Sequence, residues 1–180
     1  MARKEKRGRA GKASYFVPAT SGKYVYSGPL YSPDESSITA KKANVRRMLF
    51  SIGITALSAI CGFLPVPGLG NTFYVLVPYA LTLIFAAVSL WKAGRIAHWG
   101  GENLREYVYN TTVVRLPWLL VLCVLFAVLS VIGEALYLIL NGINKADLPF
   151  VIIFFFISAA VSVSTLIWRK VETSIQWNKR

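Results

Sequence analysis

The sequence predicts an all-α integral membrane protein with four transmembrane helices. Four long apolar segments lie at about residues 48–64, 72–91, 117–140 and 149–168. At about 1.5 Å of rise per residue, each segment is long enough to cross, or nearly cross, a hydrocarbon layer of roughly 30 Å. Hydrophobic residues make up 55% of the chain and are gathered in these runs, not spaced at amphipathic intervals, which disfavours a soluble bundle.

The basic residues predict how the chain is oriented. Of the 20 Lys and Arg residues, eleven precede the first segment, four lie between the second and third, and four follow the fourth. Lys145 alone lies on the opposite side, between the third and fourth segments. Because short loops rich in Lys and Arg stay in the cytoplasm, we expect both termini to be cytoplasmic and the protein to lie in the cell membrane.

The sequence divides into a short N-terminal segment and a membrane domain. Residues 1–35 form a basic, Tyr-rich segment, and residues 36–180 form the four-span domain, with a cytoplasmic connector at 92–116. Pro33–Ser36 predicts a helix start, because acidic residues stabilise the first turn of a helix. The basic residues that follow, up to Arg47, predict a helix that lies at the inner leaflet and leads into the first span.

Two small elements are expected on the same side as the termini. Tyr15–Val17 and Tyr24–Tyr26 flank a Ser21-Gly22 turn signal, which predicts a small β-hairpin. A hairpin of two strands is marginal in water, so it needs the membrane interface, the connector or a partner protein to pack against. In the connector, Glu102–Val114 carries apolar residues at helical spacing and predicts an interfacial helix.

The first two spans resemble the last two. Leu57–Ile60 recurs as Leu129–Ile132 at an offset of 72 residues, and Ala86–Ser89 recurs as Ala159–Ser162 at an offset of 73. Both matches keep the same in–out–in order, as in parallel repeats related by an axis along the membrane normal. Apolar sequence also produces such matches by chance, so two repeated helical hairpins are one of two interpretations that the sequence leaves open.

Glu134 is the strongest candidate site residue, since it is the only acidic residue inside a span. A carboxylate is costly in hydrocarbon, which makes it a candidate proton or ion site. Its place roughly 25 Å along its helix, near the outer interface, equally suits a structural carboxylate. Lys145 or the hydroxyl of Tyr74, Tyr79 or Tyr137 is its expected partner.

Basic residues beside the spans are candidate contacts for anionic lipid. Each contributes roughly 1 kcal/mol when it lies close to a negatively charged membrane surface. Nucleic acid is the other candidate partner of a basic tail, but it is disfavoured because no nucleic-acid module is recognisable. The candidate lipid contacts are Lys41, Lys42, Arg46, Arg47, Arg169 and Lys170.

Residue types suited to catalysis are sparse. His98 is the single histidine, and Cys61 and Cys123 lie in separate spans at depths that differ by on the order of 10 Å. The sequence has no Cys-x-x-Cys pair, zinc-ligand spacing, phosphate-binding loop or nucleophile elbow. We therefore expect no catalytic residue, metal or cofactor, and an enzyme is the least favoured class.

Two functions remain. The first is a non-enzymatic accessory or scaffold subunit that binds partner proteins and anionic lipids at the cytoplasmic face, where the large polar elements lie. The second is a small oligomeric transporter or channel that uses Glu134 and the Ser-rich fourth span. Four helices of this length enclose little aqueous space, so the second function would require several copies of the chain.

Overall fold

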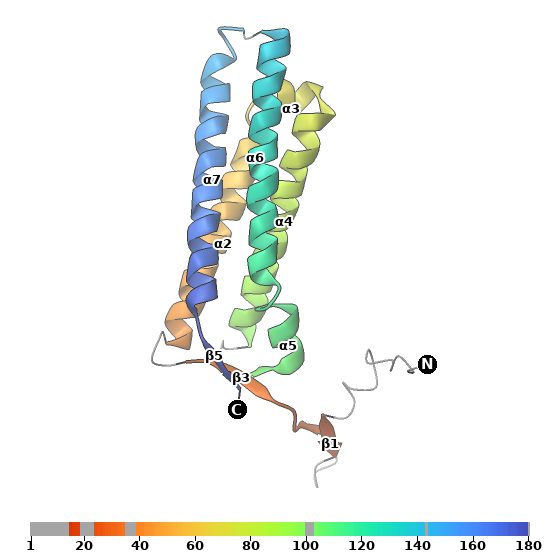
Figure 1. Ribbon diagram of the computed structural model, residues 1–180, viewed down its shortest axis with the longest axis vertical. Helices are drawn as coiled ribbons and strands as arrows, with labels where there is room; N and C mark the ends of the chain where they lie inside the picture. Colours follow the sequence, from red (N-terminus) through yellow and green to blue (C-terminus); the bar gives the residue numbers. More distant parts are fainter. Residues whose placement is uncertain (1–14, 19–23, 35–38, 100–102, 143, 180) are drawn as a thin grey trace, which may run out of the picture.

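The computed structural model describes residues 15–18, 24–34, 39–99, 103–142 and 144–179. Four helices in it are long and apolar enough to cross a membrane, which confirms the predicted fold class and is expected of a multi-pass membrane protein. These helices are α2 (Ala40–Gly62), α4 (Phe73–His98), α6 (Leu116–Asn141) and α7 (Leu148–Ser174) (Figure 1).

The four helices form a closed bundle. α2 packs against α4 and α7, and α6 packs against the same two helices. A short helix, α3 (Pro67–Asn71), joins α2 to α4 and also contacts α6. We call the end that carries α3 the loop end, and the opposite end, where α2 begins and α7 finishes, the basic end (Figure 1).

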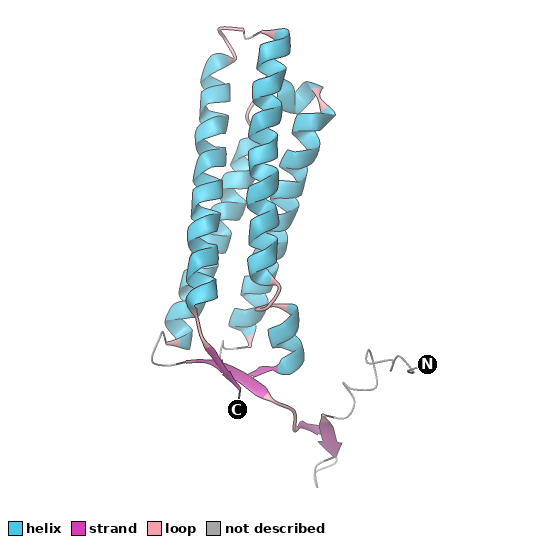
Figure 2. Cartoon of the chain, viewed as in Figure 1, coloured by secondary structure: helices cyan, strands magenta, loops and turns pink. Residues whose placement is uncertain are grey.

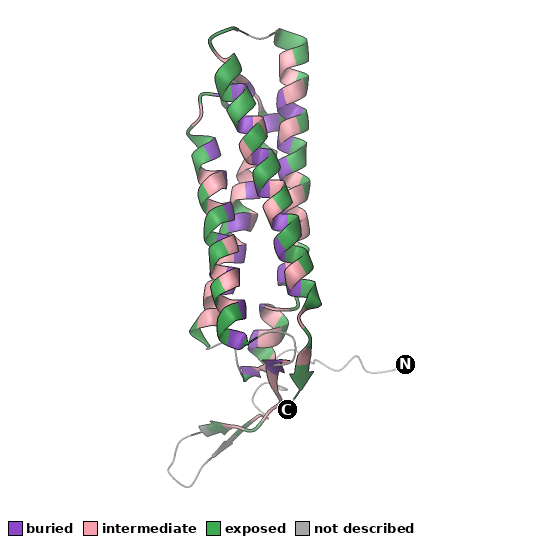
Figure 3. Cartoon of the chain, turned by 90° about the vertical axis from the view of Figure 1, so that its left-hand side faces the viewer, coloured by how far each residue is buried: buried purple, intermediate pink, exposed green. Residues whose placement is uncertain are grey.

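The bundle is apolar outside and partly polar inside. Phe63, Phe73 and Ile139 are 87%, 82% and 78% exposed, and all four helices carry exposed large apolar residues. Figure 3 shows that exposed positions lie on the outward faces of the helices and buried ones face the interior. Soluble monomers rarely expose apolar surface on this scale, whereas lipid tails cover it at no cost. Hydroxyl side chains occupy the interior, namely Ser51, Ser58, Thr82, Ser89, Ser130, Ser158 and Thr165.

Short strands lie beyond the basic end (Figure 2). β1 (Phe16–Pro18) and β2 (Tyr24–Tyr26) pair as an antiparallel hairpin. In a second sheet, β3 (Leu30–Pro33) pairs antiparallel with both β4 (Leu104–Arg105) and β5 (Trp177–Lys179). The N-terminal segment, the connector and the C-terminus are therefore joined by backbone hydrogen bonds.

The second sheet rests on a small apolar cluster at the basic end. The rings of Tyr31 and Tyr109 stack with centroids 4.2 Å apart, and the ring of Trp177 meets that of Tyr109 edge-on. These rings close over side chains from α4, β4 and α5 (Glu106–Thr111). The buried members of the cluster are Ile96, Leu104 and Val108.

The structure corrects three boundaries predicted from the sequence. The hairpin is present, but its first strand is Phe16–Pro18, one residue later than expected. Pro33 is the last residue of β3, which corrects the helix start predicted there, and α2 begins at Ala40; the rest of that prediction, at residues 35–36, lies outside the described residues. The connector helix begins at Glu106, because Leu104 and Arg105 pair with β3 instead. In the last two cases strand pairing with distant residues overrides the local signal.

The two pairs of matching segments differ in whether matching residues are equally buried in the bundle. Ser58 and Ser130, related by the first match, are both 2% exposed and face the interior. In the second match Ala86 is 1% exposed, whereas Ala159 is exposed. The first match therefore preserves the inward face and the second does not.

Close packing of α4 on α6 depends on Gly133. A Cβ at this position would lie 2.8 Å from the backbone oxygen of Tyr74, too close for the backbones to keep their spacing. We expect Gly133→Ala to lower the free energy of unfolding by about 1–3 kcal/mol, the usual cost of overpacking. Gly94→Ala is the matched control, because a Cβ there meets nothing within 4 Å. Thermal unfolding in detergent measures both, and equal midpoints would contradict this packing.

Candidate functional site

Glu134 is completely buried near the loop end, with 0% of its surface exposed. Its Oε1 accepts a hydrogen bond of 3.2 Å from the backbone N–H of Gly68 in α3. A Cβ on Gly68 would lie 2.9 Å from Glu134 Cδ, so glycine permits this close approach. The other oxygen, Oε2, has no hydrogen-bond partner within the part of the chain that the structure describes. Glu134 thus fastens α3 across the end of the bundle and keeps one acceptor free.

The partner of Glu134 differs from those that the sequence suggested. Lys145 is exposed, and Tyr79 donates its hydroxyl hydrogen to the backbone oxygen of Ser58 at 2.7 Å. Across the described residues, neither Tyr74 nor Tyr137 donates to Glu134. The donor is a backbone amide, which residue types do not reveal.

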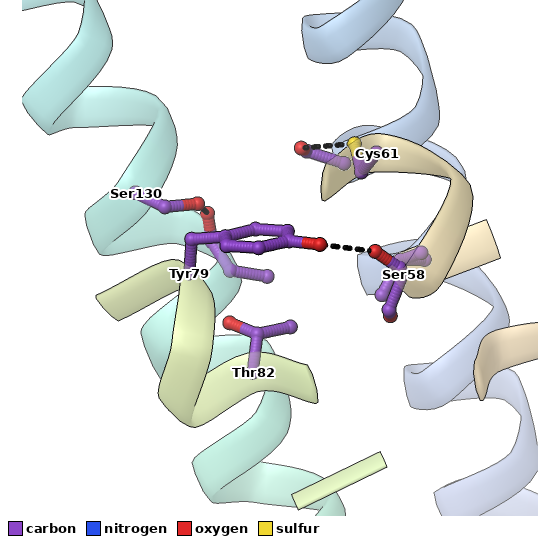
Figure 4. A pocket seen from close by; sticks show the side chains of 8 residues that line it. Ser58, Cys61, Tyr79, Thr82 and Ser130 are labelled. Carbon is purple, nitrogen blue, oxygen red and sulfur yellow. Dashed lines mark hydrogen bonds between the residues drawn. The ribbon is translucent and has the colours of Figure 1, made fainter. Parts of the chain in front are cut away.

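A small cavity lies in the middle of the bundle, lined by apolar surface together with hydroxyl and thiol groups. Its volume of about 10 Å³ is close to that of one water molecule. Figure 4 shows Tyr79 reaching across it towards Ser58, whose own hydroxyl oxygen has no partner among the described residues. The thiol of Cys61 lies 3.8 Å from Ser158 Oγ on the facing helix. The remaining lining residues are Thr82, Ala127, Ser130 and Val161.

Most interior hydroxyls bond to their own helix. Thr82 donates to the oxygen of Pro78 at 3.0 Å, and Ser130 to that of Ala127 at 2.8 Å. In the Ser-rich fourth span, Thr165 donates to the oxygen of Val161 at 2.6 Å. Such back-bonding satisfies the hydroxyl locally and allows close helix packing.

A buried ion pair joins α2 to α7 at the basic end. Arg47 Nε lies 2.7 Å from Glu172 Oε1 and 2.9 Å from Oε2, and Arg47 is 1% exposed. Trp168 donates its indole N–H to Glu172 Oε1 at 3.1 Å, and Arg47 Nη1 donates to Asn44 at 3.2 Å. The ring of Trp177 in β5 lies 5.5 Å from the guanidinium carbon, a cation–π contact. The pair therefore connects two spans and the second sheet.

The ion pair corrects one predicted lipid contact. Arg47 is buried and its charge is neutralised by Glu172, so its guanidinium does not reach lipid head groups. Lys41, Lys42, Arg169 and Lys170 are exposed, and Arg46 is half-exposed, at the same end. These five side chains are placed where lipid contact is feasible.

Sequence reasoning overlooked Glu172 and its partners. Glu172 lies four residues after Trp168, which places both on one face of α7. Its signal in the sequence is a lone acidic residue within the basic stretch that follows the fourth span. Nothing in the sequence indicates that Arg47, and not Arg46, would meet it from 125 residues away.

Lys92 makes a further connection at the basic end. Its side chain is only 8% exposed and its ammonium donates to the backbone oxygen of Thr111. Because Thr111 is the last residue of α5, this contact ties the connector to α4.

The β1–β2 hairpin extends away from the bundle (Figures 1 and 3). Its Phe16 and Val25 side chains are 41% and 56% exposed. Tyr26 anchors it, since its hydroxyl donates to the oxygen of Pro29 at 3.2 Å and accepts from the N–H of Glu106 at 3.3 Å. The hairpin thus presents apolar side chains on a base fixed to the connector.

Arg105 supports the same base through aromatic contacts. Its guanidinium carbon lies 5.2 Å from the ring centroid of Tyr26, 5.8 Å from that of Phe16 and 5.0 Å from that of Trp99. These cation–π contacts link both strands of the hairpin to the end of α4.

Among the described residues, no group of three or more His, Cys, Asp or Glu side chains is placed to hold a metal ion. Comparison of the chain with models of protein families, with curated proteins and with solved structures finds no match.

The buried ion pair should show strong energetic coupling. Replacing one partner leaves the other charge buried, so we expect Arg47→Met or Glu172→Leu to cost about 3–5 kcal/mol of stability. The double variant should cost less than either single variant, because it removes both charges. Unfolding in mixed detergent micelles measures all three, with exposed Arg169→Gln as a control expected to change stability by less than about 0.5 kcal/mol. Additive losses in the double variant would rule out the coupling.

Proposed function

We propose that the protein is a non-enzymatic accessory or scaffold subunit of the cell membrane that binds a partner protein through the β1–β2 hairpin. The observation that supports this most is the display of exposed Phe16 and Val25 on a hairpin anchored to the bundle. An exposed apolar surface on a soluble element indicates an interaction site. Its occupant is expected to be a protein, because the hairpin extends beyond the helices that would lie in lipid.

The orientation is part of this proposal. Nineteen of the 20 basic residues belong to the side of the spans that carries the termini and the connector. The positive-inside rule then favours a cytoplasmic location for both termini and for the hairpin. The partner would accordingly be a cytoplasmic protein or the cytoplasmic part of a membrane protein.

The hairpin suits recognition by strand addition. A two-stranded hairpin has two edges whose backbone groups are free to pair with another strand. In this mode backbone hydrogen bonds supply affinity and alternate side chains supply specificity. Phe16, paired with Tyr26, and Val25, paired with Val17, lie on opposite faces of the hairpin, so each would fill a separate apolar pocket of the partner.

Glu134 is the residue that supports the alternative function, a small oligomeric transporter. A fully buried carboxylate with an unpartnered oxygen is suited to bind a proton or a cation. The central cavity holds about one water molecule, which favours the scaffold over conduction by a single copy. A pathway would have to form between copies of the chain.

Removing the apolar side chains of the hairpin tests the scaffold. We expect Phe16→Ser/Val25→Ser to reduce recovery of a stoichiometric partner from native membranes at least about tenfold, as loss of two interface anchors would. The unfolding midpoint of the bundle should change little, because the ring contacts of Phe16 are with Tyr26 and Arg105 at the base of the hairpin, and Val25 is exposed. Val114→Ser, at a 49% exposed position between α5 and α6, is the control. Quantitative crosslinking measures the partner, and equal recovery from all variants would contradict the proposal.

Transport is tested separately in liposomes. If the protein is a scaffold, proteoliposomes should show proton, sodium and potassium fluxes no greater than those of empty liposomes, with or without Glu134→Gln. A flux that the wild-type chain supports and Glu134→Gln abolishes would instead establish the alternative.

A further inference from the structure

A groove between α2 and α7 opens on the lipid-facing surface near the basic end. Its volume of about 380 Å³ falls in the range of roughly 300–1,000 Å³ that is usual for small-molecule sites. One end carries a charged side chain, and the remainder is almost entirely apolar. Its lining includes Arg46, Leu49, Phe50, Gly53, Leu57 and Ser164.

Gly53 lines the middle of the groove. A Cβ at this position would meet nothing within 4 Å, so a larger side chain there would extend into the space of the groove. Leu49 and Leu57 lie one turn before and after Gly53 on the same helix face, and Leu49 is 69% exposed. The three positions form a continuous apolar channel along α2, with Ser164 of α7 on its other side.

Arg46 supplies a positive charge where this channel reaches the basic end. It is half-exposed, and no described carboxylate forms an ion pair with it. Its neighbour Arg47 points inward to Glu172, so only one of the two guanidinium groups is neutralised. Lys42, one helical turn nearer the basic end, is exposed and adds a second charge on the same face.

We propose that this groove binds one anionic phospholipid, with its phosphate on Arg46 and an acyl chain along Leu49, Gly53 and Leu57. Within a bilayer the groove faces hydrocarbon, and its apolar walls offer water too few hydrogen bonds, so an acyl chain fills it. The paired N–H groups of the Arg46 guanidinium match the geometry of the phosphate oxygens, and the charge of Lys42 favours a head group with net negative charge. The groove lies on the bundle, away from the hairpin, so this site is independent of the proposed function.

Lipid retention tests the site. The protein is reconstituted in vesicles of equal parts phosphatidylglycerol and phosphatidylcholine, extracted in mild detergent, and its bound lipid is identified by native mass spectrometry. We expect one phosphatidylglycerol for each wild-type chain. Arg46→Gln should lower that occupancy about tenfold, as expected for losing a charge-assisted hydrogen bond, with Arg46→Lys intermediate. Gly53→Leu should abolish retention of phosphatidylglycerol without gaining phosphatidylcholine, because its side chain would occupy the channel.

Two matched variants separate the groove from general surface effects. Gly94→Leu places the same side chain where a Cβ also meets nothing within 4 Å, and Lys170→Gln removes an exposed charge at the same end. Both should retain phosphatidylglycerol as the wild type does. Equal losses in Lys170→Gln and Arg46→Gln would overturn the site in favour of diffuse charge attraction. Retention by folded Gly53→Leu, judged by an unchanged unfolding midpoint, would also overturn it.

Discussion

The ion pair between Arg47 and Glu172 is the interaction on which the basic end depends. Removing two charges from water costs free energy unless their oxygens and N–H groups find partners. Trp168 and Asn44 supply two of those partners, whereas Arg47 Nη2 has none among the described residues. The pair closes the bundle between its first and last spans. Through Trp177 it also holds β5, which pairs with β3, and β3 leads directly to the hairpin.

Buried hydroxyls and buried carboxylates make different contacts inside the bundle. Hydroxyls such as Thr82 and Thr165 bond to their own helices and let the spans pack closely around a cavity of about 10 Å³. Among the described residues two carboxylates are buried, at opposite ends of the bundle: Glu134 holds the short helix α3, and Glu172 of α7 holds Arg47 of α2.

The spans could be predicted from the sequence because each is a continuous apolar run, a signal that does not depend on distant residues. The second sheet could not, since β4 and β5 contain two and three residues and pair with a strand some seventy or more positions away. Arg46 and Arg47 are indistinguishable by type. Neighbouring side chains on a helix point about 100° apart, so Arg47 faces Glu172 and is buried whereas Arg46 faces outward and is half-exposed. The contact between Gly68 and Glu134 could likewise not be predicted, because Gly68 makes it with its backbone amide.

Hydrogen–deuterium exchange of the Arg47→Met protein in lipid nanodiscs tests most directly whether the ion pair organises the basic end. We predict that exchange accelerates more at β3, β5 and the adjoining ends of α2 and α7 than at the centres of α4 and α6, because the pair joins α2 to α7 and contacts Trp177 of β5, and its hydrogen bonds and ring contacts among the described residues involve neither α4 nor α6. Unchanged protection of β3 and β5 would contradict it, since the sheet would then hold its place without the pair.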